Sequence, residues 1–242
     1  MSAAVRSISR LLARSGEGRA FFASRGEAAV SSGIPEVDRL TKGGFPRGGM
    51  TEILTVQQGC GELRLILGAA ARLGRACWIL SDSAAFEPYA PALAQTGIDI
   101  GEQLFAVPAT PEEAFWCAEH AAASGETDAV IAWLPPLSRE KDFAAMRRLH
   151  LAAERTGTTV FVFRPYGMCC VSSPAELRLQ LMPNRRTDTV TIRAVRRRSL
   201  FSQSASAEVD LAALTCTGSS RFFSSKPVQP ELPFEITHCL PA

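Results

Sequence analysis

The fold is constrained most by a regular alternation between short apolar segments and longer segments with helical periodicity. Five segments have the composition and length of buried strands: residues 51–56, 76–80, 104–107, 129–134 and 159–163. Four segments between them have the apolar spacing of helices: residues 63–73, 86–95, 112–123 and 142–155. Strands and helices that alternate in this way form βαβ units. The sequence therefore predicts an α/β domain with a mainly parallel sheet that is buried on both faces.

The pattern changes after Pro174. Residues 176–182 and 189–195 alternate apolar and polar side chains around the turn PNRRTD, which predicts an antiparallel hairpin with one face exposed. From about residue 200, Ser, Thr, Ala and Pro dominate, and we expect a poorly ordered tail. We therefore divide the chain into an N-terminal helical segment (1–30), an α/β domain (31–199) and a largely disordered tail (200–242). Within the domain, the Gly- and Pro-rich stretch 31–49 is expected to be an ordered connection.

Composition places the chain among ordinary globular proteins, with 46% apolar residues, 21% charged residues and a net charge of +2. No apolar run approaches the roughly 18 residues that span a bilayer. The seven cysteines are scattered and show no CxxC pairing, which favours a reducing cytoplasm over a zinc site or a disulfide framework. The first 25 residues hold five arginines and resemble an organelle transit peptide. An amphipathic helix with Val5, Ile8, Leu11 and Leu12 facing inward explains the same residues.

The turn QQGCGE lies between the first expected strand and its helix, where a phosphate-binding P-loop would lie. A P-loop, GxxxxGK[ST], uses its lysine to reach phosphates and its hydroxyl to hold Mg²⁺. We align Gly61 with the second glycine of this motif, which leaves Gly59 within the loop. Val56 then stands at the position of the first glycine, Glu62 at that of the lysine and Leu63 at that of the Ser or Thr. A carboxylate at that position repels a triphosphate. The turn therefore indicates a degenerate nucleotide site.

Basic residues are concentrated in the C-terminal third, where residues 178–226 contain nine basic and three acidic side chains. Contact with DNA or with an acidic partner is one interpretation, and a solvated polar strand face, on which alternation places Arg178 and Arg193, is the other. No aromatic residues interleave with these arginines, so stacking on single strands is unsupported. The candidate contact residues are Arg185, Arg186, Arg196, Arg197 and Arg198.

The other candidate residues have weaker patterns. The tail sequence QPELPF, with Gln229, Leu232 and Phe234, resembles the hexapeptide by which bacterial replication proteins dock on the sliding clamp. Trp133, followed by two prolines, marks either a binding surface or a buried strand end. The histidines share no metal-ligand spacing, so we expect structural or surface roles and no metal: His120, His150 and His238.

Several unusual segments cover roughly residues 31–198: GGFPRGGMTEI, YAPALAQTGID, the Trp of AVIAWL, RRLHLAAERTGTTVFVFRP, SSPAELRL and the basic stretch at Arg196–Arg198. These segments resemble the RecA-like core and, more closely, the ImuA family of accessory proteins in bacterial mutagenic translesion synthesis. The cell-division inhibitor SulA shares this scaffold. The resemblance implies a RecA-like fold. It also places Cys169 and Cys170 in the loop with which RecA-like proteins contact DNA, although adjacent cysteines more often only fill space.

The departures from RecA fall on the residues that carry phosphoryl transfer. The resemblance aligns Trp133 with the Mg²⁺-coordinating Asp and Ser83 with the catalytic Glu, while Glu62 replaces the P-loop Lys. All three parts of the site are altered together, so we expect no catalytic residue, no cofactor and no ATPase activity.

The resemblance implies a non-catalytic adaptor in DNA-damage-induced (SOS) error-prone translesion synthesis. The implied partners are an ImuB-like Y-family protein and RecA and, through them, an error-prone polymerase and the sliding clamp. We expect partner contact on the first helix, with Ile8, Leu11 and Leu12, and on the tail. Three alternatives stay open: a SulA-like division inhibitor, a weak RecA-type ATPase and a DNA-binding protein.

Overall fold

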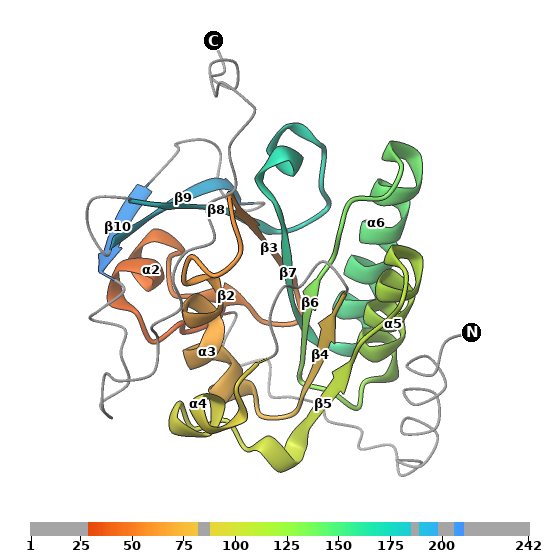
Figure 1. Ribbon diagram of the computed structural model, residues 1–242, viewed down its shortest axis with the longest axis horizontal. Coiled ribbons are helices and arrows are strands. Elements are labelled where there is room, and N and C mark those ends of the chain that lie inside the picture. Colours follow the sequence, from red (N-terminus) through yellow and green to blue (C-terminus); the bar gives the residue numbers. More distant parts are fainter. Residues whose placement is uncertain (1–28, 82–87, 185–188, 198–205, 211–242) are drawn as a thin grey trace.

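The computed structural model describes residues 29–81, 88–184, 189–197 and 206–210. In these residues it shows an α/β architecture built on one large mixed sheet with helices on both faces (Figure 1). The sheet has the strand order β10-β9-β8-β3-β7-β6-β4-β5. Its strands are β3 (Met50–Thr55), β4 (Ala76–Leu80), β5 (Gln103–Ala106), β6 (Ala129–Trp133), β7 (Thr159–Pro165), β8 (Leu177–Pro183), β9 (Thr189–Arg197) and β10 (Ser206–Asp210).

The part of the sheet from β8 to β5 is parallel, as the alternation of strands and helices predicted. Strand β3 is the fourth of the eight strands of the whole sheet and pairs in parallel with both β7 and β8. All six residues of β3 are buried, and so are all five residues of β4 and of β6. Helices cover both faces of the sheet, so β4 and β6 are apolar on both faces, whereas β3 also buries Thr51, Glu52 and Thr55. Strands β8, β9 and β10 then pair antiparallel and extend the sheet at one edge.

The helices divide between the two faces of the sheet (Figure 1). Helices α2 (Pro35–Leu40), α3 (Glu62–Leu73) and α4 (Ala90–Gln95) contribute to one buried apolar cluster, which includes Trp78, Trp133 and Phe161. Helices α5 (Pro111–Ser124) and α6 (Arg139–Thr156) contribute to the other, which includes Met146 and Leu149. Two short 3₁₀ helices, η1 (Ile100–Glu102) and η2 (Tyr166–Cys170), complete the helical elements of the described residues.

The connection at residues 31–49 is ordered, as expected. It contains α2 and strand β2 (Phe45–Pro46), which pairs with β1 (Ala29–Val30). Gly44 has a φ of +119°, and a Cβ there would lie 2.1 Å from the carbonyl oxygen of Val30. Only glycine fits this close approach of two backbone segments.

Three sequence expectations are corrected by the structure. Helix α4 begins at Ala90, not at residue 86, because Tyr89 is extended and Pro91 stands in the first helical turn. The hairpin does not expose one face along β8, whose first five residues are all buried. Residues 206–210 are not part of an unstructured tail, since they form β10, which pairs with β9 and buries Val209.

Of the helices in the described part of the chain, none combines the length and apolarity needed to cross a bilayer. The expected N-terminal helical segment lies almost wholly outside the described residues, and so does the tail beyond residue 210.

Candidate functional site

The loop between β3 and α3 is closed by a side chain of its own helix. Gly61 adopts the left-handed conformation, with φ +94°, and Glu62 begins α3 directly after it. Glu62 is only 2% exposed. Its Oε1 accepts a hydrogen bond from the backbone N–H of Gly59 at 2.8 Å. The carboxylate therefore turns back into the loop.

This arrangement places a negative charge where a P-loop receives one from its ligand. Backbone N–H groups of such a loop point at the nucleotide phosphates and provide much of the binding. Here the Gly59 N–H is already bound by a buried carboxylate. A phosphate at this position would have to displace Glu62 and would be repelled by its charge. The turn that contains Gly59 and Gly61 is thus occupied by the carboxylate of Glu62.

Cys60, in the middle of the loop, is not an activated nucleophile. Its side chain is buried, and burial raises the pKa of the thiol from 9.0 to about 12, with further contributions from the charge of Glu62 and a hydrogen bond to it. Because the thiolate is the reactive species, Cys60 is inert at neutral pH. Cys77 in β4 and Cys117 in α5 are also buried, and burial is the main cause that raises their pKa values to about 12 and about 11.

Trp133 lies at the carboxyl end of β6, next to Phe163 of β7. The two rings stack with centroids 4.6 Å apart and an angle of 16° between their planes. Trp133 is 3% exposed and belongs to the same apolar cluster as Cys60. The interpretation of Trp133 as a binding surface is therefore wrong. An aromatic stack fills the strand end to which the resemblance assigns a metal-binding carboxylate.

On the opposite face of the sheet, beneath η2, four charged side chains form a buried network. Arg178 Nε lies 2.7 Å from Glu52 Oε2, and Arg164 Nη1 lies 4.0 Å from Glu52 Oε1. Arg164 also donates to both carboxylate oxygens of Asp142, at 2.8 and 2.5 Å. The four residues are 0–5% exposed, and their formal charges cancel. The network links β3, β7, β8 and α6.

Arg178 also holds the connection between β7 and β8. Its guanidinium donates to the carbonyl oxygens of Met168 and Val171, at 2.8 and 3.0 Å. This connection contains η2 and contacts β3, so it covers the polar face of β8. The expectation that Arg178 lies on a solvated strand face is wrong, because η2 lies over that face. The sequence carries one local signal of the network, which is the charged residue Glu52 within a segment that is predicted to be a buried strand.

The remaining candidate residues are only partly placed. Arg193 of β9 is half-buried, and β9 brings Arg196 and Arg197 opposite Arg178 and Leu177. Cys169 and Cys170 lie in η2 with their sulfur atoms 3.5 Å apart, and Cys170 is exposed. Candidates outside the described residues are Ser83, Arg185, Arg186, Arg198, Gln229, Leu232 and Phe234, together with Ile8, Leu11 and Leu12.

Comparison with known proteins does not place the chain in a family. No protein-family model matches it, and no curated protein shows significant sequence similarity to it.

Proposed function

We propose that this chain is a non-catalytic adaptor with a degenerate RecA-like domain. In this proposal it acts in DNA-damage-induced error-prone translesion synthesis and joins an ImuB-like Y-family protein and RecA to the polymerase complex. The observation that carries the non-catalytic part is the hydrogen bond between the Gly59 N–H and the buried carboxylate of Glu62. The assignment to translesion synthesis rests on the resemblance of residues 31–198 to the ImuA family.

A self-closed loop favours a scaffold over an NTPase. An NTPase needs its loop open to phosphate and a hard ligand for Mg²⁺ near the strand ends. In this chain, Glu62 closes the loop, and the indole of Trp133 packs against Phe163. The parallel strands from β8 to β5, with helices on both faces, are compatible with a RecA-like core. A domain of this kind is suited to making contacts while it turns over no substrate.

The edge strand β5 supports a role in assembly. It ends the sheet next to β4, so one side of its backbone is unpaired with any described strand. Phe105, within β5, is 40% exposed, and Val107, directly after it, is 60% exposed. An edge strand with exposed apolar side chains is a surface to which another chain can add a strand. RecA-like domains assemble edge to edge, so β5 is the part of this domain that we expect RecA to contact.

The test combines nucleotide titration with partner capture. The full chain is titrated calorimetrically with ATP and Mg²⁺, and it is offered to an immobilised ImuB-like protein and to RecA filaments. The adaptor proposal expects capture by both partners without measurable ATP binding. Micromolar ATP affinity would refute the non-catalytic part and favour the ATPase alternative. Failure of both captures would refute the adaptor role.

Two variants sharpen the result. Glu62→Gln keeps an acceptor for the Gly59 N–H but removes the charge, and it should leave capture unchanged. Phe105→Asp places a charge on β5 and should weaken RecA capture at least about tenfold, while binding of the ImuB-like protein serves as the control for folding. DNA affinity that falls steeply with salt would instead favour the nucleic-acid alternative. Binding to a tubulin-like division protein would favour the SulA-like alternative.

A further inference from the structure

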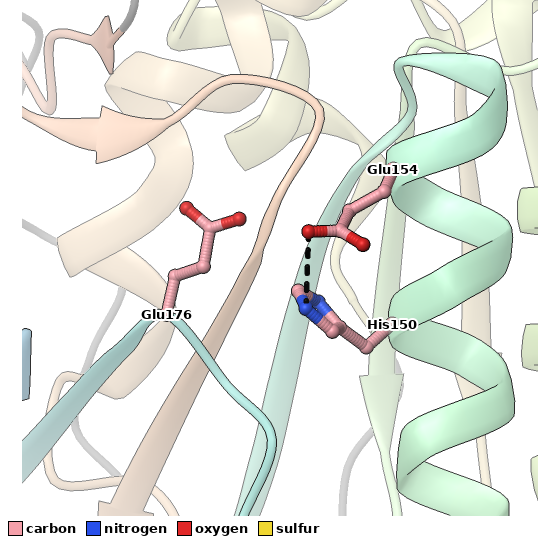
Figure 2. Close-up of side chains that lie close together, drawn as sticks. All are labelled: His150, Glu154 and Glu176. Carbon is pink, nitrogen blue, oxygen red and sulfur yellow. Dashed lines mark ion pairs between the residues drawn. The ribbon is translucent and has the colours of Figure 1, made fainter. Parts of the chain in front are cut away.

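At the amino-terminal edge of the sheet, a histidine and a glutamate of α6 come together with a glutamate from the connection that precedes β8. His150 and Glu154 lie one turn apart on α6, and Glu176 immediately precedes β8. Figure 2 shows the first two side chains projecting from the same side of the helix toward Glu176. One ligand atom from each residue lies within 4.8 Å of the other two. We propose that these three residues bind a divalent transition-metal ion such as Zn²⁺.

The pair on α6 already has the spacing of two metal ligands. His150 Nε2 lies 3.3 Å from Glu154 Oε1. Two ligand atoms that are each about 2.1 Å from a tetrahedral ion lie about 3.4 Å apart. An ion can therefore be inserted between these atoms with little movement of either side chain. The i, i+4 spacing keeps both side chains on one face of the helix.

Glu176 is held close to this pair by the backbone around it. Its N–H donates to the carbonyl oxygen of Met50 at 3.0 Å, which fixes the segment to the start of β3. Its carboxylate occupies the space beside Gly49, where a Cβ would lie 2.8–2.9 Å from the carboxyl atoms. Glycine at position 49 thus leaves room for the third ligand. The ligand atoms of the three residues lie within 4.8 Å of one another, against the roughly 3.4 Å that separates two ligands of a tetrahedral ion, so in this proposal the Glu176 carboxylate moves toward the pair when the ion binds.

The chemistry of the three groups selects the class of ion. Two carboxylates and a neutral imidazole carry a charge of −2, which a divalent cation neutralises. An imidazole ligand favours Zn²⁺ and similar transition metals over Mg²⁺ and Ca²⁺, which prefer oxygen. His150 is 3% exposed, whereas Glu154 is exposed, so one side of the site is dry and the other admits a water as fourth ligand.

The site is separate from the closed loop that supports the proposed function. Glu176 is bonded to Met50, the first residue of β3, whereas the loop follows Thr55, the last residue of that strand. A bound ion would join the last turns of α6 to the start of β8. The inference does not depend on the adaptor role, and either proposal can fail alone.

The test measures Zn²⁺ binding to the full chain by calorimetry and by thermal unfolding. We expect saturable binding with one ion per chain and a rise in melting temperature. Glu154→Gln and Glu176→Gln should each weaken Zn²⁺ affinity by roughly tenfold or more. Glu140→Gln, an exposed change in the first turn of the same helix, should leave the affinity within about twofold. Because Glu154 is exposed, its variant keeps the fold and tests the site even if Glu176→Gln does not.

Cobalt(II) and a cysteine variant distinguish this site from a thiolate site. Co²⁺ held by nitrogen and oxygen shows weak visible bands without sulfur-to-cobalt charge transfer. The double variant Cys169→Ser/Cys170→Ser should bind Zn²⁺ as the unmodified chain does. Absence of Zn²⁺ binding, affinity unchanged in both glutamate variants, or affinity lost in the cysteine variant would each overturn the proposal.

Discussion

Removing the charge of Glu52 tests whether the buried ion network acts as a unit. Glu52→Gln preserves the shape of the side chain but leaves Arg178 without its partner at 2.7 Å. It also leaves Arg164 with Asp142 as its ion-pair partner in the network. The variant therefore turns a neutral buried cluster into one with a net positive charge.

The magnitude follows from the separation and the burial. At 2.7 Å, the attraction between two unit charges is about 6 kcal/mol at an effective dielectric constant of about 20. Burying each ion costs several kcal/mol, so the intact pair contributes little net stability. Removing one partner leaves the cost of burying the other. We expect Glu52→Gln to lower the free energy of unfolding by about 3–5 kcal/mol.

A double-mutant cycle measures the coupling directly. Arg178→Met should also be strongly destabilising, because it removes the ion pair and the hydrogen bonds to η2. The double variant, which leaves neither charge unpaired, should cost less than the sum of the two, with a coupling of about 2–3 kcal/mol. The assay is urea unfolding followed by tryptophan fluorescence.

The control is an exposed ion pair of the same chain. Glu119→Gln breaks the contact with Arg148, at 2.9 Å on the surface, and should change stability by less than about 1 kcal/mol. If Glu52→Gln costs no more than this control, and the effects of Glu52→Gln and Arg178→Met are additive, the charges do not form a buried unit and the reasoning is refuted.

Three further outcomes can be measured on the same protein. Gly68→Ala should destabilise the protein, although alanine favours helices, because its Cβ would lie 2.1 Å from the carbonyl oxygen of Ser32. Gly167→Ala is the control: no described residue beyond its chain neighbours lies within 4 Å of the added Cβ, so its stability in the same urea assay should be nearly unchanged. The pKa of Cys60 is raised from 9.0 to about 12, so the stability that its buried thiol contributes is present below pH 9.0 and is lost as the pH rises toward 12. Cys60→Ala should therefore reduce the loss of stability between about pH 9 and pH 12, and an unchanged loss would contradict that pKa. At neutral pH, exposed Cys170 should be alkylated much faster than Cys60 in peptide mass mapping, and equal rates would show that the loop opens.

The parallel core of the sheet could be predicted from local pattern because helix and strand periodicities are properties of neighbouring residues. The apolar runs at residues 76–80 and 129–134 match β4 and β6 to within one residue. The expected sequence of strands and helices is confirmed from β3 to β9, although α4 is shorter than predicted. The prediction that Glu62 stands where a P-loop has its lysine used only the spacing within one turn.

The buried ion pairs and the outer strand pairing join residues that are distant in the sequence, so local pattern did not predict them. Alternation in β8 predicted that Arg178 is solvated, but the η2 segment covers that face, and Glu52 of the neighbouring strand β3 forms an ion pair with the arginine. Strand β10 was not predicted, because a short polar segment forms a strand only where another strand is available for pairing, and β9 is that strand.

The sequence by itself determined the order of the elements and the apolar strands, because each is encoded within a few consecutive positions. Only the tertiary structure decided where the charges lie. It turned Glu62 into the loop, buried four ionised side chains beneath a crossover, and brought His150 and Glu154 next to Glu176. Charged side chains carry no periodic signal of their partners, and their burial depends on which segments the fold places over them.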